Sequence, residues 1–147
     1  MVKILILEDS YYMIDFLKER FDEKGWSYDI ANNIASAQDF YENNQYDCFI
    51  IDLHVDPVGL TEDEFNSFEP YYGWAWFYNY VLLPNQRGEN TLLRKKAIIY
   101  SKYSEEFKKS NYRYHIESIE IISKDDEKED NKVIVYIEKI IKNKNSN

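Results

Sequence analysis

The sequence predicts an α/β protein in which a parallel sheet carries helices on both faces. Short, continuous apolar runs alternate along the chain with segments of helical periodicity, and such runs are typical of strands that are buried on both faces. This alternation indicates parallel strands that are joined by helical crossovers. Four of the apolar runs also end in polar residues, and in an open parallel sheet the site forms at the carboxyl ends of the strands.

Each predicted element follows from its local pattern. The expected strands are Val2–Leu7, Trp26–Ala31, Cys48–Leu53, Ala97–Tyr100 and Ile119–Ser123. The expected helices are Tyr11–Lys24, Ile34–Asn43, a helix within Gly73–Leu83, Glu105–Tyr112 and Asn131–Ile141. In the first helix Met13, Leu17 and Phe21 recur every four residues, which predicts one buried face, and Gly25 is a natural end signal.

The connection between the third and fourth strands, residues 54–96, interrupts the alternation. Thr61 and Glu64 have the spacing of a capping box, which predicts the start of a helix. Nine aromatic residues then lie within Phe65–Tyr80, more than one short helix can bury on its inward face. They could add a layer of core, but aromatic residues are enriched at interfaces. We therefore predict that this segment is the main interaction surface and supports a homodimer.

A second loop is predicted after the aromatic segment, because Pro84, Gly88 and the basic triplet Arg94–Lys96 follow it. At 147 residues the chain is expected to form one domain over residues 1–142. The insert would then cover approximately residues 54–72 and 84–96. The polar segment 143–147 is expected to be a frayed tail.

The composition argues against several classes of protein. A formal net charge of −9 argues against a nucleic-acid surface, which needs a basic stripe. The single cysteine, Cys48, excludes an internal disulfide and lies in an apolar run where we expect it to be buried. No signal peptide or membrane-spanning run is evident, so a cytoplasmic protein without a membrane partner is expected.

Polar side chains follow four of the predicted strands. Glu8 and Asp9 follow the first strand, Asp52 lies at the end of the third, Ser101 follows the fourth and Lys124 follows the fifth. Because the carboxyl ends of parallel strands lie at one edge, these side chains should meet in one cleft. Three carboxylates, a hydroxyl and an ammonium are suited to binding a divalent cation and receiving a phosphoryl group.

These residues carry a resemblance to the receiver domain of two-component response regulators. The matching segments are Lys3–Asp9, Phe49–Asp52, Ala97–Ser101 and Ile121–Lys124. The resemblance implies a flavodoxin-like, doubly wound, five-stranded parallel sheet of order 2-1-3-4-5, here with an enlarged connection between the third and fourth strands. It also implies a stand-alone signalling domain of a phosphorelay rather than an enzyme, with at most self-catalysed phosphoryl transfer to and hydrolysis from Asp52.

The resemblance assigns a role to each site residue. Asp52 would be the phosphoacceptor, and Ser101 and Lys124 would contact the phosphoryl group. Mg²⁺ would be held by four groups, namely Glu8, Asp9, Asp52 and the backbone carbonyl of His54. A histidine kinase or phosphotransfer protein would donate the phosphoryl group, and a downstream protein would dock to the phosphorylated form. No nucleic acid is expected among the partners.

Three positions differ from the usual receiver pattern. Lys102 follows the switch hydroxyl where a small residue is usual, and Asp125 replaces the proline after Lys124. A cis bond before a residue other than proline costs roughly 3 kcal/mol, so the Lys124–Asp125 bond should be trans. Ile121 occupies the position of the switch aromatic, a role for which Tyr100 or Tyr103 could substitute. These differences favour, as an alternative, a pseudo-receiver that binds partners independently of phosphorylation.

An enzyme with this architecture is the third alternative. A flavin-binding protein would need a phosphate cradle after the first strand, where Glu8 and Asp9 would instead repel phosphate. A metal-dependent phosphohydrolase would need a second acid near Asp52, and the next residues are Leu53 and His54. We expect His54 to be a solvated loop residue.

Overall fold

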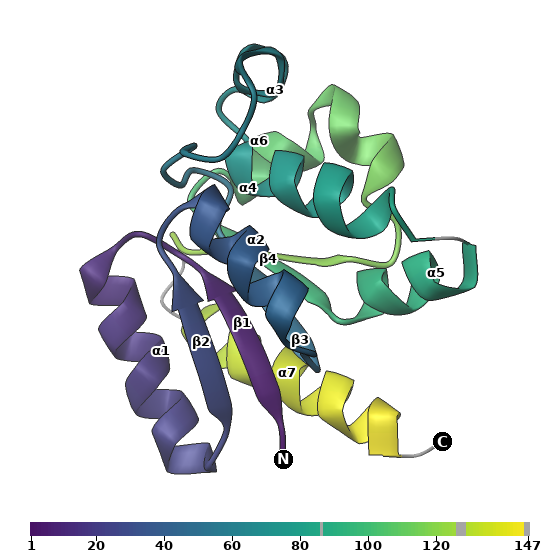
Figure 1. Ribbon diagram of the computed structural model, residues 1–147. Helices are drawn as coiled ribbons and strands as arrows, with labels where there is room; N and C mark the ends of the chain where they lie inside the picture. Colours follow the sequence, from purple (N-terminus) through teal and green to yellow (C-terminus); the bar gives the residue numbers. More distant parts are fainter. Residues whose placement is uncertain (86, 126–128, 146–147) are drawn as a thin grey trace.

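A five-stranded parallel sheet forms the centre of the computed structural model, which describes residues 1–85, 87–125 and 129–145 (Figure 1). The strand order is β2-β1-β3-β4-β5, which confirms the predicted topology. The strands are β1 (Lys3–Leu7), β2 (Ser27–Ala31), β3 (Cys48–Ile51), β4 (Ala97–Ser101) and β5 (Glu120–Ser123). All of the pairings between neighbouring strands are parallel.

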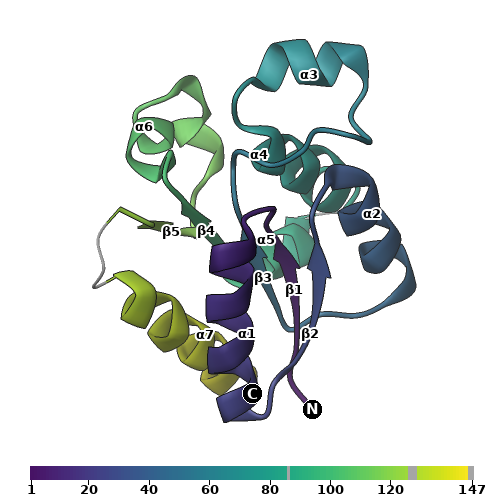
Figure 2. The ribbon, with the colours of Figure 1, turned by 90° about the vertical axis from the view of Figure 1, so that its left-hand side faces the viewer.

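Helices cover both faces of the sheet (Figures 1 and 2). The α-helices are α1 (Tyr11–Lys24), α2 (Ile34–Asn43), α3 (Glu62–Phe68), α4 (Tyr72–Trp76), α5 (Arg87–Lys95), α6 (Ser104–Lys108) and α7 (Glu129–Asn145). A π-helix, η1 (Phe77–Leu82), continues α4, and a 3₁₀ helix, η2 (Asn111–His115), follows α6. In the described part of the chain, no helix combines the length and apolar character that crossing a bilayer requires.

The alternating side chains of β1 divide the interior into two cores. Ile4 and Ile6 point to one face, where they pack with α1 and α7. Leu5 and Leu7 point to the other face, where they pack with α2, α4, η1 and α6. The predicted end of α1 is confirmed, because Gly25 adopts a left-handed conformation with φ 70°. Cys48 is buried, as expected.

Helix α5 corrects the prediction of a second loop over residues 84–96. Pro84 precedes the helix, and Gly88 lies in its first turn, so neither interrupts its hydrogen bonds. Leu93 packs against the core, and the Arg94 guanidinium donates a hydrogen bond to the His115 carbonyl. The signals that suggested a loop therefore mark the approach to a helix.

The predicted helix Glu105–Tyr112 is also wrong in its second half. Helix α6 ends at Lys108, and Ser110 begins the separate 3₁₀ helix η2 by accepting a hydrogen bond from the backbone N–H of Tyr112. Helix α7, in contrast, runs beyond the predicted helix end at Ile141. It reaches Asn145, and Lys144 forms an ion pair with Asp47. Residues 146 and 147 lie outside the described residues.

The middle of the aromatic segment is core, so the predicted interaction surface does not include its buried rings; the interaction itself stays a prediction. The side chains of Trp74, Trp76 and Phe77 are all 0% exposed. Trp74 packs against Phe107 of α6 with ring centroids 5.5 Å apart, and the Trp76 indole N–H donates to Gln38 Oε1 at 3.0 Å. The segment therefore fills the space between α2 and α6, and its excess aromatics meet partners from distant parts of the chain.

The amino-terminal half of the insert has the predicted cap. The Thr61 hydroxyl accepts from the Glu64 N–H, and the Glu64 carboxylate accepts from the Thr61 N–H, which completes the capping box of α3. The same carboxylate accepts hydrogen bonds from Asn79 and from the Tyr80 hydroxyl. Glu64 therefore joins α3 to η1 within the insert.

Gly73 brings the insert into direct contact with the third strand. Its N–H donates to the Leu53 carbonyl at 2.9 Å. A Cβ atom added at this position would lie 1.9 Å from the carbonyl oxygen of Asp52. Only glycine allows the backbone of α4 to approach so closely. The insert is therefore fixed to the residue that the sequence identified as the centre of the site.

Replacement of Gly73 by alanine should destabilise the protein, because α4 must move away from Asp52. We expect a loss of about 2–3 kcal/mol in the free energy of unfolding, measured by urea denaturation. Gly88→Ala is the matched control, because no atom lies within 4 Å of its added Cβ and it is helical. It should raise stability by about 0.5 kcal/mol. Equal effects of the two substitutions would contradict the close approach at Gly73.

Candidate functional site

The register of the sheet brings the predicted site residues to one edge. Leu7 pairs with Ile51, so the residues that follow them, Glu8 and Asp52, are neighbours. The Asp52 N–H donates to the Leu7 carbonyl at 2.9 Å, which extends the strand pairing by one residue. Carboxylate oxygens of Glu8, Asp9 and Asp52 lie within 4.8 Å of one another. The predicted acidic cluster is therefore present in the fold.

Lys124 reaches into this cluster from the end of β5. Its Nζ lies 3.0 Å from Asp52 Oδ2, and it also forms an ion pair with Glu8. The Lys124 N–H donates to the Ser101 carbonyl at 3.2 Å, which holds the turn after β5 against β4. The Lys124–Asp125 bond is trans, as predicted. Lys124 therefore points at Asp52 although the next residue, Asp125, is not a proline.

Burial and like charge make the carboxyl groups of Glu8 and Asp9 difficult to ionise. Burial and then the charge of Asp52 raise the pKa of Glu8 to about 7, although Lys124 acts in the opposite direction. The pKa of Asp9 is also raised, again by burial and then by Asp52. Burial acts to lower the pKa of Lys124, but Asp52 and Glu8 outweigh it and the pKa rises. The cluster thus carries excess negative charge that a cation would compensate.

The start of α1 orients the first acidic pair. Glu8 Oε2 accepts hydrogen bonds from the N–H groups of Asp9 and Ser10, at 3.1 and 3.2 Å. The Ser10 side chain in turn accepts from the Met13 N–H and caps α1. Glu8 is buried, whereas Asp9 is exposed. The buried carboxylate is therefore fixed by the backbone, and the exposed one remains open to a ligand.

The donor set fits a hard divalent cation. Mg²⁺ prefers oxygen ligands, retains several waters and uses only one or two carboxylates of a protein. Glu8, Asp9 and Asp52 supply oxygens close enough to share one ion. The pKa values of Glu8 and Asp9 are raised by burial and then by the charge of Asp52, which a bound cation would offset. The cluster contains neither histidine nor cysteine, the ligands that softer metals favour.

Ser101 and Tyr103 form the β4 side of the site. Ser101 is fully buried, and its Oγ accepts a hydrogen bond from the Tyr103 N–H at 3.2 Å. The hydroxyl of Ser104, also buried, donates to the Ile122 carbonyl at 2.8 Å and fixes the start of α6 against β5. Lys102 is exposed between them.

His54 lies in a row of aromatic rings that sequence reasoning missed. Its N–H donates to Asp52 Oδ1 at 3.4 Å, and its side chain is exposed, as expected. The His54 ring centroid is 5.3 Å from that of Tyr103 and 6.0 Å from that of Tyr72. Tyr72 stacks on Phe65 of α3 with ring centroids 5.3 Å apart. The aromatic row Tyr103–His54–Tyr72–Phe65 therefore runs from the site to the insert.

The two candidate substitutes for the switch aromatic lie on different faces. Tyr100 is buried with the α1 and α7 core, and the Lys124 Nζ lies 5.8 Å from its ring centroid. Tyr103 is half-buried beside His54, on the face of α6. Ile121 is half-buried and packs against the core on the α6 side of the sheet, as Tyr103 does. Tyr103 is itself a member of the aromatic row.

A pH titration tests the charge balance of the cluster. In the absence of divalent cations the Glu8 carboxyl should titrate near pH 7, followed by ¹³C NMR. Asp52→Asn should lower this midpoint and Lys124→Met should raise it, because the former removes a like charge and the latter an opposite one. The exposed Asp63→Asn change, in α3, serves as the control.

The raised pKa of Glu8 also makes the stability of the folded state depend on pH. The folded-state pKa of Glu8 lies above its ordinary value of 4.5, so the folded state holds this proton more tightly than the unfolded chain does. The contribution of Glu8 to stability is therefore complete below about pH 4.5 and is lost as the pH rises to about 7. A Glu8 midpoint that is identical in all three variants would contradict this charge coupling.

Comparisons with known proteins identify the fold. No protein-family model matches the chain, and no curated protein matches it in sequence. A sensor protein from Polaromonas sp. JS666 superposes with a TM-score of 0.67 at 16% identity, covering 97% of both chains. The receiver domain of the Francisella response regulator 1452 gives 0.63 at 18% identity, covering 98% of this chain and 99% of that one.

A third solved structure extends the comparison to a ligand-bound protein. The response regulator TrrA from Thermotoga maritima, in complex with Mg²⁺–BeF, gives a TM-score of 0.59 at 20% identity, covering 92% of this chain and 99% of that one. The structural neighbours are thus receiver domains along nearly the whole chain, and the five-stranded parallel sheet has their strand order. The chain has the fold of response-regulator receiver domains.

Proposed function

We propose that the protein is a receiver domain of a cytoplasmic two-component system or phosphorelay, phosphorylated on Asp52 in the presence of Mg²⁺. One observation carries this proposal: the Asp52 carboxylate lies among Glu8, Asp9 and Lys124 at the carboxyl edge of the sheet. A nucleophilic carboxylate, two further acids and an ammonium are the groups that phosphoryl transfer to aspartate needs.

Glu8, Asp9 and Asp52 would hold Mg²⁺ together with the backbone carbonyl of His54. The ion would supply positive charge to the phosphoryl oxygens. It would also offset the burial of Glu8 and Asp9 and their repulsion by Asp52, which together raise the pKa of both groups. A related fold supports this assignment, because the Thermotoga TrrA structure is a complex with Mg²⁺–BeF. A stabilising effect of Mg²⁺ on the folded state follows by mass action.

Each protein group has a defined role in the transfer. An oxygen of Asp52 attacks phosphorus, and the bond from phosphorus to the nitrogen of a donor phosphohistidine breaks, with its electron pair remaining on nitrogen. Lys124, which now contacts Asp52 at 3.0 Å, can contact a phosphoryl oxygen instead. The Ser101 hydroxyl donates a hydrogen bond to the product. The chain acts as a phosphoacceptor, and its own catalysis is limited to this transfer and to hydrolysis from Asp52.

The aromatic row provides a route for the signal. The Tyr103 N–H contacts Ser101, so a movement of Ser101 towards the phosphoryl group also moves the Tyr103 ring against His54. Tyr72 and Phe65 continue this contact to α3, where a downstream protein would dock. A histidine kinase or phosphotransfer protein would supply the phosphoryl group.

A pseudo-receiver is the alternative, and one observation favours it. Lys124 already forms ion pairs with both Glu8 and Asp52, so part of the cluster is compensated without a metal. Asp125, Lys102 and Ile121 also depart from the receiver pattern. In this alternative the same fold binds a partner whether or not Asp52 is phosphorylated.

Incubation with acetyl phosphate and Mg²⁺ distinguishes the two functions. Intact mass spectrometry should show one phosphoryl adduct on the wild type, because acetyl phosphate replaces the protein donor. The adduct should disappear in Asp52→Asn and when EDTA removes Mg²⁺. Asp63→Asn, an exposed acid in α3, is the matched control and should keep the adduct. An equal yield on Asp52→Asn would exclude Asp52 as the acceptor, and no adduct on the folded wild type would favour the pseudo-receiver.

The aromatic row makes a separate prediction. Beryllofluoride with Mg²⁺, which imitates a phosphoryl group on aspartate, should shift the NMR signals of Tyr103, His54, Tyr72 and Phe65. Tyr103→Ala should confine the shifts to residues next to Asp52, because the first contact of the row is lost.

Tyr114→Ala removes a 74% exposed ring outside the aromatic row and should leave the shifts unchanged. If the signals of Phe65 and Tyr72 still shift fully in Tyr103→Ala, the signal travels by another route.

A further inference from the structure

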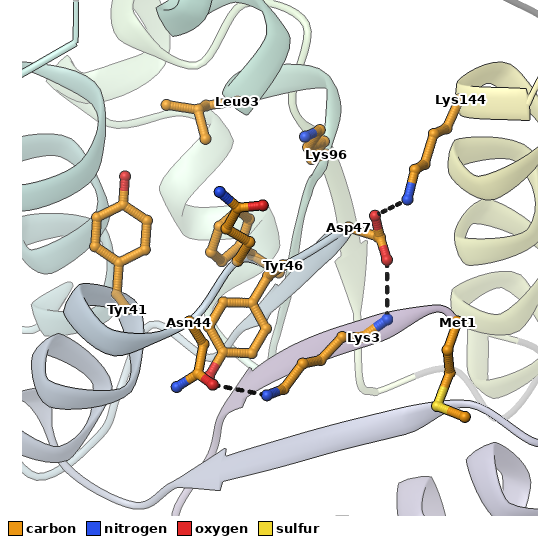
Figure 3. Close-up of a pocket in the computed structure, with 11 residues that line it drawn as sticks. Met1, Lys3, Tyr41, Asn44, Tyr46, Asp47, Leu93, Lys96 and Lys144 are labelled. Atoms are coloured by element: carbon orange, nitrogen blue, oxygen red, sulfur yellow. Dashed lines mark hydrogen bonds and ion pairs between the residues drawn. The ribbon is translucent and has the colours of Figure 1, made fainter.

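Lysine side chains gather at the amino ends of the strands, whereas carboxylates gather at the carboxyl ends around Asp52. Lys3 is the first residue of β1, Asp47 precedes β3 and Lys96 precedes β4, while Lys144 lies in the last turn of α7. These residues line an open cavity of about 700 Å³, shown in Figure 3. This volume lies within the range of about 300–1,000 Å³ that is usual for small-molecule sites.

The lining of the cavity is basic in a protein whose net charge is −9. Lys3, Lys96 and Lys144 face a single carboxylate, that of Asp47. A second cavity of about 470 Å³ shares Asp47, Lys96 and Lys144 and adds Lys95. The Lys3 ammonium lies 3.4 Å from Asp29 Oδ2 and donates to Asn44 Oδ1 at 2.8 Å, so its charge is largely satisfied.

Asp47 forms an ion pair with Lys144 but not, among the described residues, with Lys96. Its Oδ2 accepts from the Lys3 backbone N–H at 2.9 Å, and its Oδ1 forms the ion pair with Lys144. Burial acts to raise the pKa of Asp47, but these contacts and the charge of Lys96 outweigh it, and the pKa falls. Within the described residues the Lys96 ammonium has no hydrogen-bond partner and acts on Asp47 through charge alone. Lys96 is therefore the group that is free to bind an anion.

An apolar wall stands opposite the lysines. Tyr41 and Leu93 lie on one side of the cavity, and Asp47 with Lys144 lies on the other (Figure 3). Tyr41 is held in place by Phe49, with ring centroids 6.0 Å apart, and by an edge contact with Trp76 at 6.2 Å. Leu93 packs against the same core. The wall is therefore fixed by the core and suited to a flat apolar group.

We propose that this cavity binds a small organic anion, in which a phosphate or carboxylate group is attached to a flat apolar body. The anionic group contacts Lys96 and the neighbouring Lys144, and the apolar body lies against Tyr41 and Leu93. This site is formed by the amino ends of the strands and is separate from Asp52, which lies at their carboxyl ends. It does not depend on the proposed phosphoacceptor function.

Phenyl phosphate is a suitable probe, with inorganic phosphate and phenol as its two halves. Calorimetry is carried out on the full chain as Asp52→Asn with EDTA present, so that neither Mg²⁺ nor an acyl phosphate contributes. Phenyl phosphate should bind saturably, and each half should bind at least about tenfold more weakly. In amide NMR spectra its shifts should centre on Lys3, Asp47 and Lys96.

Lys96→Gln should weaken phenyl phosphate binding about tenfold, because it removes a charged partner. Lys18→Gln, an exposed lysine on α1, should leave the affinity unchanged. If a variant is destabilised, the shifts in the Asp52→Asn parent still locate the site. Absence of saturable binding, shifts centred on Lys124, or equal loss of affinity in both lysine variants would overturn the proposal. Equal affinity for inorganic phosphate would overturn the role of the apolar wall.

Discussion

The buried ion pairs of Lys124 with Glu8 and Asp52 are the interaction on which the acidic cluster at the carboxyl edge of the sheet depends. The Lys124 side chain is 7% exposed, and the side chains of its partners Glu8 and Asp52 are 3% and 10% exposed. Breaking a buried pair by removing one partner typically costs 3–5 kcal/mol, because a charge is left uncompensated. Burial and then the charge of Asp52 raise the pKa of Glu8, and Lys124 offsets them only in part. Affinity for a cation and stability of the metal-free state are thus in competition at this edge.

The insert between β3 and β4 also contacts the carboxyl edge of the sheet. Gly73 fixes α4 against the carbonyl of Asp52, and the neighbouring rings of Tyr72 and His54 lead from there to Tyr103. The insert therefore contacts the backbone of Asp52 and the ring of Tyr103, so in the proposed function it would respond to changes at both. This arrangement offers a physical substitute for the aromatic that Ile121 replaces, and it makes α3 the place where a response would be presented to a partner.

The features that depend on local sequence pattern could be predicted from the sequence. The features that depend on contacts between residues far apart in the chain could not. Continuous apolar runs defined the strands, and their polar ends identified the acidic cluster because register follows from parallel pairing. Burial of Trp74 could not be predicted, since its partner Phe107 lies in another helix. The aromatic row and the amino-end cavity were missed for the same reason. Helix α5 was missed because Gly88 was taken as a sign of a loop, whereas it lies in the first turn of the helix.

A crystal structure with Mg²⁺ and beryllofluoride tests the central claim most directly. We predict beryllofluoride on the Asp52 carboxylate, and Mg²⁺ at Asp9, Asp52 and the His54 carbonyl, with Glu8 bound directly or through water. Lys124 and Ser101 should contact the fluorine atoms, so Lys124 must have left Asp52. A structure in which Lys124 still joins Glu8 to Asp52, with neither ligand at this edge under saturating conditions, would contradict the phosphoacceptor account.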